Sequence, residues 1–162
     1  MKKSKISSWI FMGFMIIVIY VLFGIYKLNY FNGFIKAETN IGISEFKRDK
    51  TVKYSEADSY KIVSPTQNDA AFYKEIEVEP HTPYKITCMV KTDNVVPLAE
   101  NTDGGACISI IEASEVSKSI TGTTDWQPIE IMFNSQNRTT VKIGFRLGGN
   151  TGTAQGTAWF SD

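Results

Sequence analysis

Apolar and polar residues alternate with a period of two along most of the chain after residue 40. This alternation is typical of strands that have one buried face and one solvated face. The clearest run spans residues 83–92. Its apolar side consists of Tyr84, Ile86, Cys88 and Val90. Seven or more such runs, each followed by its own turn, predict an all-β, antiparallel β-sandwich over residues 41–162.

The same alternation predicts which side chains form the core. Every second residue is apolar in residues 129–133 and again in residues 141–147. Trp126 and Trp159 stand at the starts of strands, and we assign both to the core because large aromatic residues are highly buried on average. The predicted core is Tyr84, Ile86, Val90, Ile108, Ile110, Trp126, Ile129, Ile131, Phe133, Ile143, Phe145 and Trp159.

Residues 9–26 form an uncharged and almost wholly apolar run, WIFMGFMIIVIYVLFGIY. Because a helix needs roughly 17–25 apolar residues to cross a bilayer, the run predicts a transmembrane helix. A cleaved secretory signal is the alternative, but its apolar core is usually about 7–15 residues long and is followed by a small-residue cleavage site, which this sequence lacks. Lysines at positions 2, 3 and 5 keep the N-terminus in the cytoplasm and place the rest of the chain outside.

These features divide the chain into four segments and locate it at the cell membrane. Residues 1–8 are a basic cytoplasmic tail, residues 9–26 the single membrane span, residues 27–40 a juxtamembrane segment and residues 41–162 the extracytoplasmic sandwich. Without the four lysines of the first 27 residues, 13 basic side chains remain against 17 acidic ones. An acidic domain without a basic stripe argues against nucleic acid as a partner.

The two cysteines, Cys88 and Cys107, are candidates for a disulfide in an extracellular domain. The alternation argues against that pairing. Cys88 shares a side with Ile86 and Val90 and points inward, whereas Cys107 lies between two residues with a better claim to the core and points outward. Neighbouring strands cannot bridge cysteines on opposite faces without moving the backbone, so we favour two thiols over a disulfide.

Residues 59–162 resemble a known family in the order of their short motifs. The motifs are Ser-Tyr-Lys-Ile at 59–62, Pro-Tyr-Lys-Ile-Thr at 83–87, Gly-Ala-Cys-Ile-Ser-Ile at 105–110, Asp-Trp-Gln at 125–127 and Gly-Thr-Ala-Trp-Phe-Ser-Asp at 156–162. This order resembles the carbohydrate-binding modules of families 4, 9 and 22, and it implies a jelly-roll sandwich with a galactose-binding-like fold. Each motif alone is a strand with a turn, so the resemblance is more specific for the fold than for an activity.

The sequence departs from this family at both ends of the domain. Family members usually open with Asn-Gly-x-Phe-Glu, of which only Asn32, Gly33 and Phe34 are present. They also continue past the final aspartate, whereas this sequence stops at Asp162. Either a short last strand suffices or the chain is the N-terminal portion of a longer membrane protein, and we favour the second.

The resemblance implies that Asp162 helps to bind a structural calcium ion. Calcium prefers several oxygen ligands, and Glu38 or Glu45 could supply another near the start of the domain. A frayed end without a ligand is the alternative for Asp162.

The sequence offers no constellation for catalysis. Its only histidine, His81, stands in a proline-rich turn, and its carboxylates are scattered. Zinc-ligand spacings, phosphate-binding glycine loops and nucleophile motifs are all missing from it. We therefore predict no catalytic activity in this chain.

A saccharide site needs an aromatic face for the apolar side of a sugar ring and polar groups for its hydroxyls. On the predicted exposed faces, Tyr73 supplies a ring, Glu75 an acceptor, Arg146 a planar donor and Met89 a soft apolar contact. Ordinary sandwich surface is the alternative, because this aromatic complement is thin.

Together, these features predict a non-catalytic, membrane-anchored module that holds a cell-surface or environmental polysaccharide or oligosaccharide. Two alternatives stay open. One is a structural or interaction domain that binds no sugar. The other is the N-terminal part of a larger membrane-bound enzyme of polysaccharide metabolism.

Overall fold

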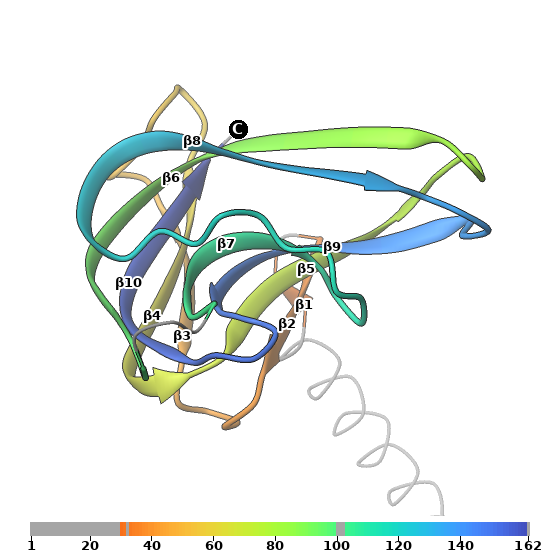
Figure 1. Ribbon diagram of the computed structural model, residues 1–162. Coiled ribbons are helices and arrows are strands. Elements are labelled where there is room, and N and C mark those ends of the chain that lie inside the picture. Colours follow the sequence, from red (N-terminus) through yellow and green to blue (C-terminus); the bar gives the residue numbers. More distant parts are fainter. Residues whose placement is uncertain (1–29, 32, 100–102, 162) are drawn as a thin grey trace, which may run out of the picture.

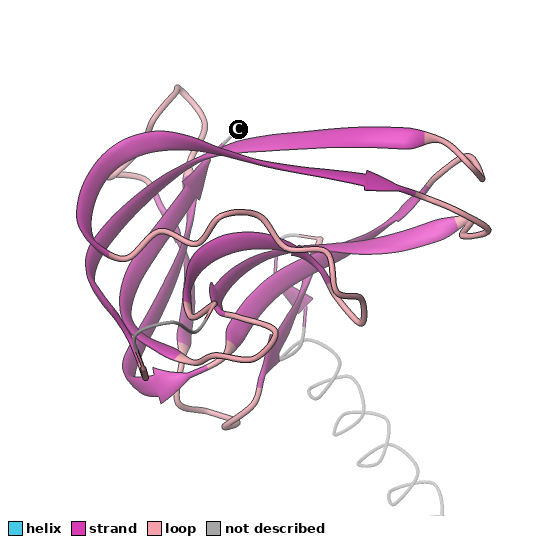
Figure 2. Cartoon of the chain, viewed as in Figure 1, coloured by secondary structure: helices cyan, strands magenta, loops and turns pink. Residues whose placement is uncertain are grey.

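The computed structural model describes residues 30–31, 33–99 and 103–161. The predicted membrane span at residues 9–26 and the predicted calcium ligand Asp162 lie outside these residues. Within them every regular element is a strand (Figure 1, Figure 2). None of the described residues belongs to a helix with the length and apolarity to span a membrane.

The strands form two five-stranded sheets in which all neighbours are antiparallel. The first sheet has the order β1 (Tyr30–Phe31), β2 (Phe34–Glu38), β5 (Ala70–Glu77), β9 (Thr140–Gly148) and β7 (Gly105–Ile110). The second sheet has the order β3 (Glu45–Asp49), β4 (Ser59–Asn68), β10 (Ala154–Ser161), β6 (Pro83–Pro97) and β8 (Gly122–Asn134). The described part of the chain therefore confirms the all-β, antiparallel prediction.

Side chains from the inner faces of both sheets form one hydrophobic core. Phe145 of the first sheet stacks on Phe160 of the second, with the ring centroids 5.3 Å apart. Six predicted core residues are buried in this cluster, namely Val90, Ile108, Ile110, Ile129, Ile131 and Phe133. Four more, Tyr84, Ile86, Ile143 and Phe145, are partly buried and pack against it. The alternation in the sequence thus gives the correct register for these strands.

The two tryptophans lie on the outer face of the second sheet rather than in the core. Trp159 is buried, but its neighbours Ala158 and Phe160 are the residues that enter the core cluster. The indole Nε1 of Trp159 donates a hydrogen bond to Asp49 over 3.0 Å. Trp126 is half-buried against Tyr54, with ring centroids 5.9 Å apart. Trp159 is therefore buried as predicted, although it lies outside the central cluster, whereas the assignment of Trp126 to the core was wrong. Both tryptophans occupy positions that alternate with residues of that cluster.

The first sheet begins before residue 41, where the sequence analysis places the start of the sandwich. β2 pairs with β5 through four residue pairs, from Ile35 opposite Tyr73 to Glu38 opposite Ala70. Phe34 enters the aromatic cluster, with its ring centroid 4.8 Å from that of Tyr60. The predicted juxtamembrane segment therefore supplies an integral strand, and Phe34 is the residue that docks it.

The two cysteines, both within the described residues, are not joined by a disulfide. Cys88 lies in β6 and points into the core, whereas Cys107 lies in β7 and is left out of that cluster. Burial raises the pKa of the Cys107 thiol to about 12. The prediction of two thiols on opposite-facing positions is confirmed.

Two adjacent residues of β8 test this register. Ile131 is buried, while Met132 is 67% exposed. Replacing Ile131 by alanine should lower the free energy of unfolding by about 2–5 kcal/mol, because it removes packed methyl groups from the core. Replacing Met132 by alanine should change it by less than about 0.5 kcal/mol. Denaturant unfolding measures both values, and a larger cost at Met132 would show that the strand is one residue out of register.

Candidate functional site

A depression of about 650 Å³ lies on the outer face of the first sheet. Its floor is formed by three neighbouring strands, with Ala37 from β2, Ala71 from β5 and Arg146 from β9. Its walls are formed by Glu38 at the end of β2 and by loop residues, which are Thr39, Asp69, Ile111, Glu112, Ala113, Ser114 and Asn150. Ile111 packs over Gly144, where a Cβ atom would lie only 2.8 Å from its Cδ1 atom. Glycine at this position therefore allows the wall to approach the sheet.

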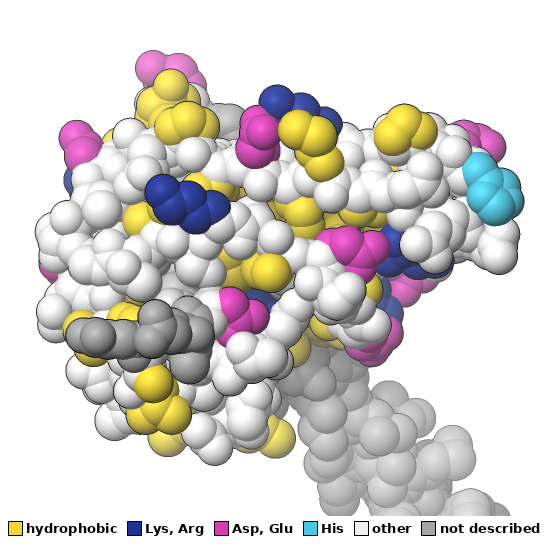
Figure 3. All heavy atoms as spheres, in the orientation of Figure 1, with side chains coloured by type: hydrophobic (Ala, Val, Ile, Leu, Met, Phe, Trp, Pro, Cys, Tyr) yellow, Lys and Arg dark blue, Asp and Glu magenta, His cyan; other side chains and the backbone are white. Residues whose placement is uncertain are grey.

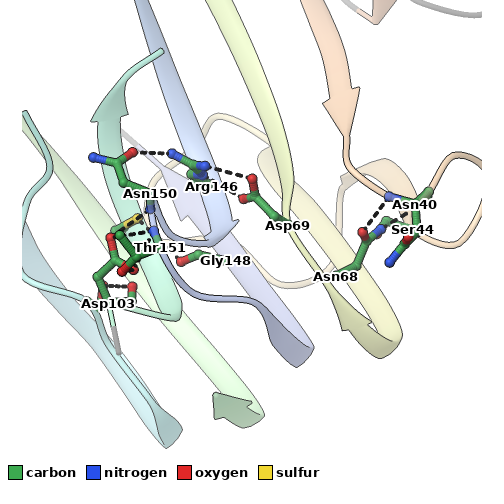
Figure 4. A network of polar contacts seen from close by, with 11 residues as sticks. Asn40, Ser44, Asn68, Asp69, Asp103, Arg146, Gly148, Asn150 and Thr151 are labelled. Carbon is green, nitrogen blue, oxygen red and sulfur yellow. Dashed lines mark hydrogen bonds and ion pairs between the residues drawn. The ribbon is translucent and has the colours of Figure 1, made fainter. Parts of the chain in front are cut away.

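The guanidinium of Arg146 is held on two sides in this depression (Figure 4). Its Nε and Nη2 atoms donate to the two carboxylate oxygens of Asp69 over 2.6 and 2.7 Å. Its Nη1 atom donates to the side-chain oxygen of Asn150 over 2.6 Å. These bonds use three of the five N–H groups of the guanidinium, so two are left without a partner among the described residues and can donate to a ligand. Burial acts to lower the pKa of Arg146, but the Asp69 carboxylate outweighs it and the pKa is raised.

Asp103 fixes the loop that carries Asn150. Its carboxylate accepts hydrogen bonds from the backbone amides of Asn150 and Thr151 over 2.7 and 3.0 Å, and from the Thr151 hydroxyl over 2.8 Å. A Cβ atom at Gly149 would lie 2.5 Å from the Asp103 carbonyl oxygen, so only glycine fits this close approach. Burial acts to raise the pKa of Asp103, but the three hydrogen bonds outweigh it and hold the pKa below its usual value.

A second set of hydrogen bonds builds the opposite wall. The carboxylate of Glu38 accepts from the backbone amides of Gly42 and Ser44 over 2.7 and 2.9 Å. It also accepts from the side-chain amide of Asn68 over 3.1 Å. Asn68 is fully buried and further contacts Asn40, as Figure 4 shows. The loop between β2 and β3 is therefore tied to the end of β4.

The depression carries an excess of negative charge. Three carboxylates line it, those of Glu38, Asp69 and Glu112, against the one guanidinium of Arg146. Lys142 neutralises Glu112 from outside the depression over 2.7 Å. The site can therefore offer both donors and acceptors to a polar ligand, but it disfavours an anionic one.

Three of the four predicted ligand-binding residues lie on the same outer face of the first sheet. Arg146 is opposite Ala71, and Tyr73 is opposite Gly144, so Tyr73 is the diagonal neighbour of Arg146. Glu75 is one step further along, opposite Lys142, and lines a smaller depression of about 180 Å³. The structure thus brings Tyr73 and Arg146 close together, with Glu75 beyond them.

Met89 does not belong to this group. It lies on β6 opposite Pro128 and Ser161, on the outer face of the second sheet. The prediction that Met89 contacts the same ligand as Arg146 is therefore wrong. Alternation identifies an outward position, but it does not say to which sheet the strand belongs.

Sequence reasoning missed Asp69 and Asn150, which orient Arg146, and it named Glu38 only as a possible calcium ligand. Asp103, which holds the loop of Asn150, is brought to it only by the fold. Of the proposed calcium ligands, Glu38 is held by hydrogen bonds within the chain, and Glu45 forms an ion pair with Lys47. Among the described residues no group of three or more His, Cys, Asp or Glu could hold a metal ion. The role of Asp162 stays a prediction.

Comparisons with known proteins show the fold. No protein-family model matches the chain, and no curated protein matches it either. Among solved structures, the enzymatically active domain of tailspike protein 4 from bacteriophage CBA120 is similar with a TM-score of 0.55 and 13% identity. The match covers 83% of this chain and 19% of the tailspike chain, so this chain spans about a fifth of that protein.

Two carbohydrate-binding modules are also structural neighbours. A CBM4 structure has a TM-score of 0.45 and 18% identity, with 79% of this chain and 83% of that chain covered. The module TmCBM61, in complex with β-1,4-galactotriose, has a TM-score of 0.41 and 13% identity, with 85% and 94% covered.

The lowered pKa of Asp103 makes its contribution to stability depend on pH. Because the folded-state pKa lies below the ordinary value of 3.8, the ionised carboxylate stabilises the fold above that pH and loses its effect as the pH falls through the lowered pKa. Replacing Asp103 by asparagine should therefore lower the free energy of unfolding at pH 7 by about 1–3 kcal/mol. The difference from the parent should shrink as the pH is lowered below 3.8, as measured by denaturant unfolding across pH.

The matched control for this change is Asp93→Asn. Asp93 is exposed, and its carboxylate accepts one long hydrogen bond of 3.4 Å from Thr123. This control should have little effect at any pH. A difference between parent and Asp103→Asn that stays constant down to low pH would contradict the proposed role of the Asp103 carboxylate.

Proposed function

We propose that this chain is a non-catalytic, membrane-anchored module that binds a saccharide outside the cell, in the depression around Arg146. The observation that carries this proposal is the fixed guanidinium of Arg146, which two neighbours orient while it keeps two N–H groups for a ligand. We assign the sandwich to the jelly-roll, galactose-binding-like class. The uncharged run at residues 9–26 supports the anchor, and the preceding lysines support its orientation.

The size and chemistry of the depression suit a small polar ligand. Its volume of about 650 Å³ falls within the range of about 300–1,000 Å³ that is usual for ligand sites. Sugar hydroxyls both donate and accept hydrogen bonds, so they match a site that presents a guanidinium beside carboxylates. Ala37, Ala71 and Ala113 add small apolar surfaces for the C–H groups of a sugar ring.

The charge of the site favours an uncharged saccharide. The lining carboxylates outnumber the guanidinium, and two of the N–H···O bonds of Arg146 already go to Asp69. A uronic acid or a sulfated sugar would bring further negative charge beside Glu38 and Asp69. Because like charges at close range destabilise one another in a partly buried site, we expect neutral glycans to bind better.

The described surroundings of the depression favour binding over catalysis. The carboxylate of Glu38 is held by three hydrogen bonds, and that of Asp69 is paired with Arg146. His81 lies in the turn between β5 and β6, whereas Asp69 directly precedes β5, so the whole length of β5 separates the two residues.

The second candidate is a structural or interaction domain that binds no sugar. It is favoured by the lining of the depression, which includes no aromatic side chain among the described residues. The tailspike match favours a third hypothesis, in which such a sandwich is one part of a longer enzyme, because the match covers only 19% of the tailspike chain.

The test replaces Arg146 by alanine in the full chain, held in lipid nanodiscs and titrated calorimetrically with a panel of neutral and acidic glycans that includes β-1,4-galactotriose. The parent should bind a neutral glycan. Arg146→Ala should weaken that binding about five-fold or more, since a lost hydrogen bond to ligand is worth roughly 1 kcal/mol or more. Tyr73→Ala should cause a smaller loss, because Tyr73 is a diagonal neighbour of Arg146 but is not one of the residues that line the depression.

Two controls keep this test interpretable. Lys85→Ala removes a cation from the outer face of the second sheet, where Lys85 pairs with Glu130, and should not change affinity. Asn150→Ala removes one of the two neighbours that orient Arg146 and should weaken binding without removing the guanidinium. Equal affinity of parent and Arg146→Ala would place the site elsewhere. A parent that binds no glycan of the panel would favour the structural domain.

A further inference from the structure

Exposed hydrophobic side chains gather at one end of the sandwich. Among the described residues, six large hydrophobic side chains are exposed, and four of them lie in the connection between β2 and β3 or at the end of β6. Ile41 is 91% exposed and Ile43 39%, in the connection between β2 and β3, while Val96 is 42% and Leu98 68% exposed at the end of β6. We call these four residues the apolar tips. Figure 3 shows hydrophobic side chains at the lower end of the molecule, where these loops lie in Figure 1.

The pairing of the strands places both loops at the same end. Asn68, the last residue of β4, donates and accepts hydrogen bonds with the backbone of Asn40, next to Ile41. Asn68 is also opposite Ala154, which in turn is opposite Pro97, the residue between Val96 and Leu98. The apolar tips therefore flank one row of residues across the second sheet.

Charged groups at this end are directed into the protein. Glu38 accepts hydrogen bonds from its own loop, Asp69 is paired with Arg146, and Asp103 holds the loop of Asn150 and Thr151. These carboxylates are therefore engaged within the chain, and among the described residues the apolar tips are the exposed large hydrophobic side chains of this end. An exposed apolar patch of this kind marks a surface that is covered by a partner.

The first strand begins opposite Ile35, three residues before the end of β2. Tyr30 is opposite Ile35 and Phe31 is opposite Phe34, so β1 runs antiparallel to β2 and its first residue faces the direction in which β2 continues toward Ile41. The uncharged run of the sequence ends at Tyr26, four residues before β1. Four residues span at most about 14 Å when fully extended. A membrane anchor at residues 9–26 would therefore hold the apolar tips within reach of the lipid.

We propose that the apolar tips contact the lipid bilayer and orient the domain with this end of the sandwich toward the membrane. The partner is the headgroup and upper acyl region of an uncharged lipid surface, which takes up scattered aliphatic side chains without requiring basic residues. This inference rests on the proposed anchor and is independent of saccharide binding. It also places Asp69 and Asn150 on the membrane-proximal side, so the depression would meet glycans carried on that same membrane.

The test places a single fluorescent bimane label on Ile41→Cys, Leu98→Cys or Met132→Cys in the full chain. Met132 is the matched control, because it is 67% exposed but lies near the opposite end of β8. The two native cysteines are buried, so the parent chain treated with the same bimane reagent gives the background fluorescence. Each variant is reconstituted in phosphatidylcholine vesicles with or without a lipid that carries a nitroxide just below its headgroup.

The labels at positions 41 and 98 should lose fluorescence to the nitroxide lipid, and the label at 132 should not. Iodide dissolved in the buffer should quench the label at position 132 and should leave the labels at 41 and 98 unquenched. Vesicle flotation is measured first, and a chain that does not float overturns the anchor and this inference together. A chain that floats, with all three labels equally open to iodide and untouched by the nitroxide lipid, overturns the docking of the apolar tips alone.

Discussion

The structure depends on the layer of aromatic rings that joins its two sheets. Phe72 of the first sheet contacts Phe46 and Tyr60 of the second, with ring centroids 5.0 and 5.7 Å apart. Removing one such buried ring costs about 3–5 kcal/mol, a large part of the stability of a small domain. This layer determines which faces of β5 and β9 point into the core. It thereby places Asp69 beside Arg146, although 77 residues separate them in sequence.

The polar site is then built outward from that pair. Arg146 is 12% exposed and Asp69 22%, so the pair is shielded enough to have a defined geometry. Such shielded pairs add little net stability, because desolvation offsets most of their attraction. The structural consequence of the pair is a fixed orientation: together with Asn150, which Asp103 holds through its loop, Asp69 holds the guanidinium in place at the floor of the depression.

Alternation in the sequence was sufficient to predict the core-facing register of the strands from residue 83 onward and the two thiols, because the period of two is a local property of each strand, but it did not reveal β1, β2 or β3. It could not show that Met89 and Arg146 lie on different sheets, since the partners of a strand are decided by contacts distant in sequence. The tryptophans misled the prediction because an aromatic ring can also be buried on an outer face, as Trp159 is beside Asp49 and Lys61. Phe34 was overlooked because its short strand gains its place from three rings of the core.

Nuclear magnetic resonance of the full chain in nanodiscs shows whether the depression around Arg146 receives an uncharged saccharide. The side-chain Nε–H signal of Arg146 and the backbone amides of Ala37 and Ala71 report on the floor of the depression. Adding a neutral oligosaccharide that the chain binds should shift these signals together, while the Nε1–H signal of Trp159 on the other sheet stays in place. Shifts confined to Trp159 and its neighbours, with the Arg146 signal unmoved, would contradict the account.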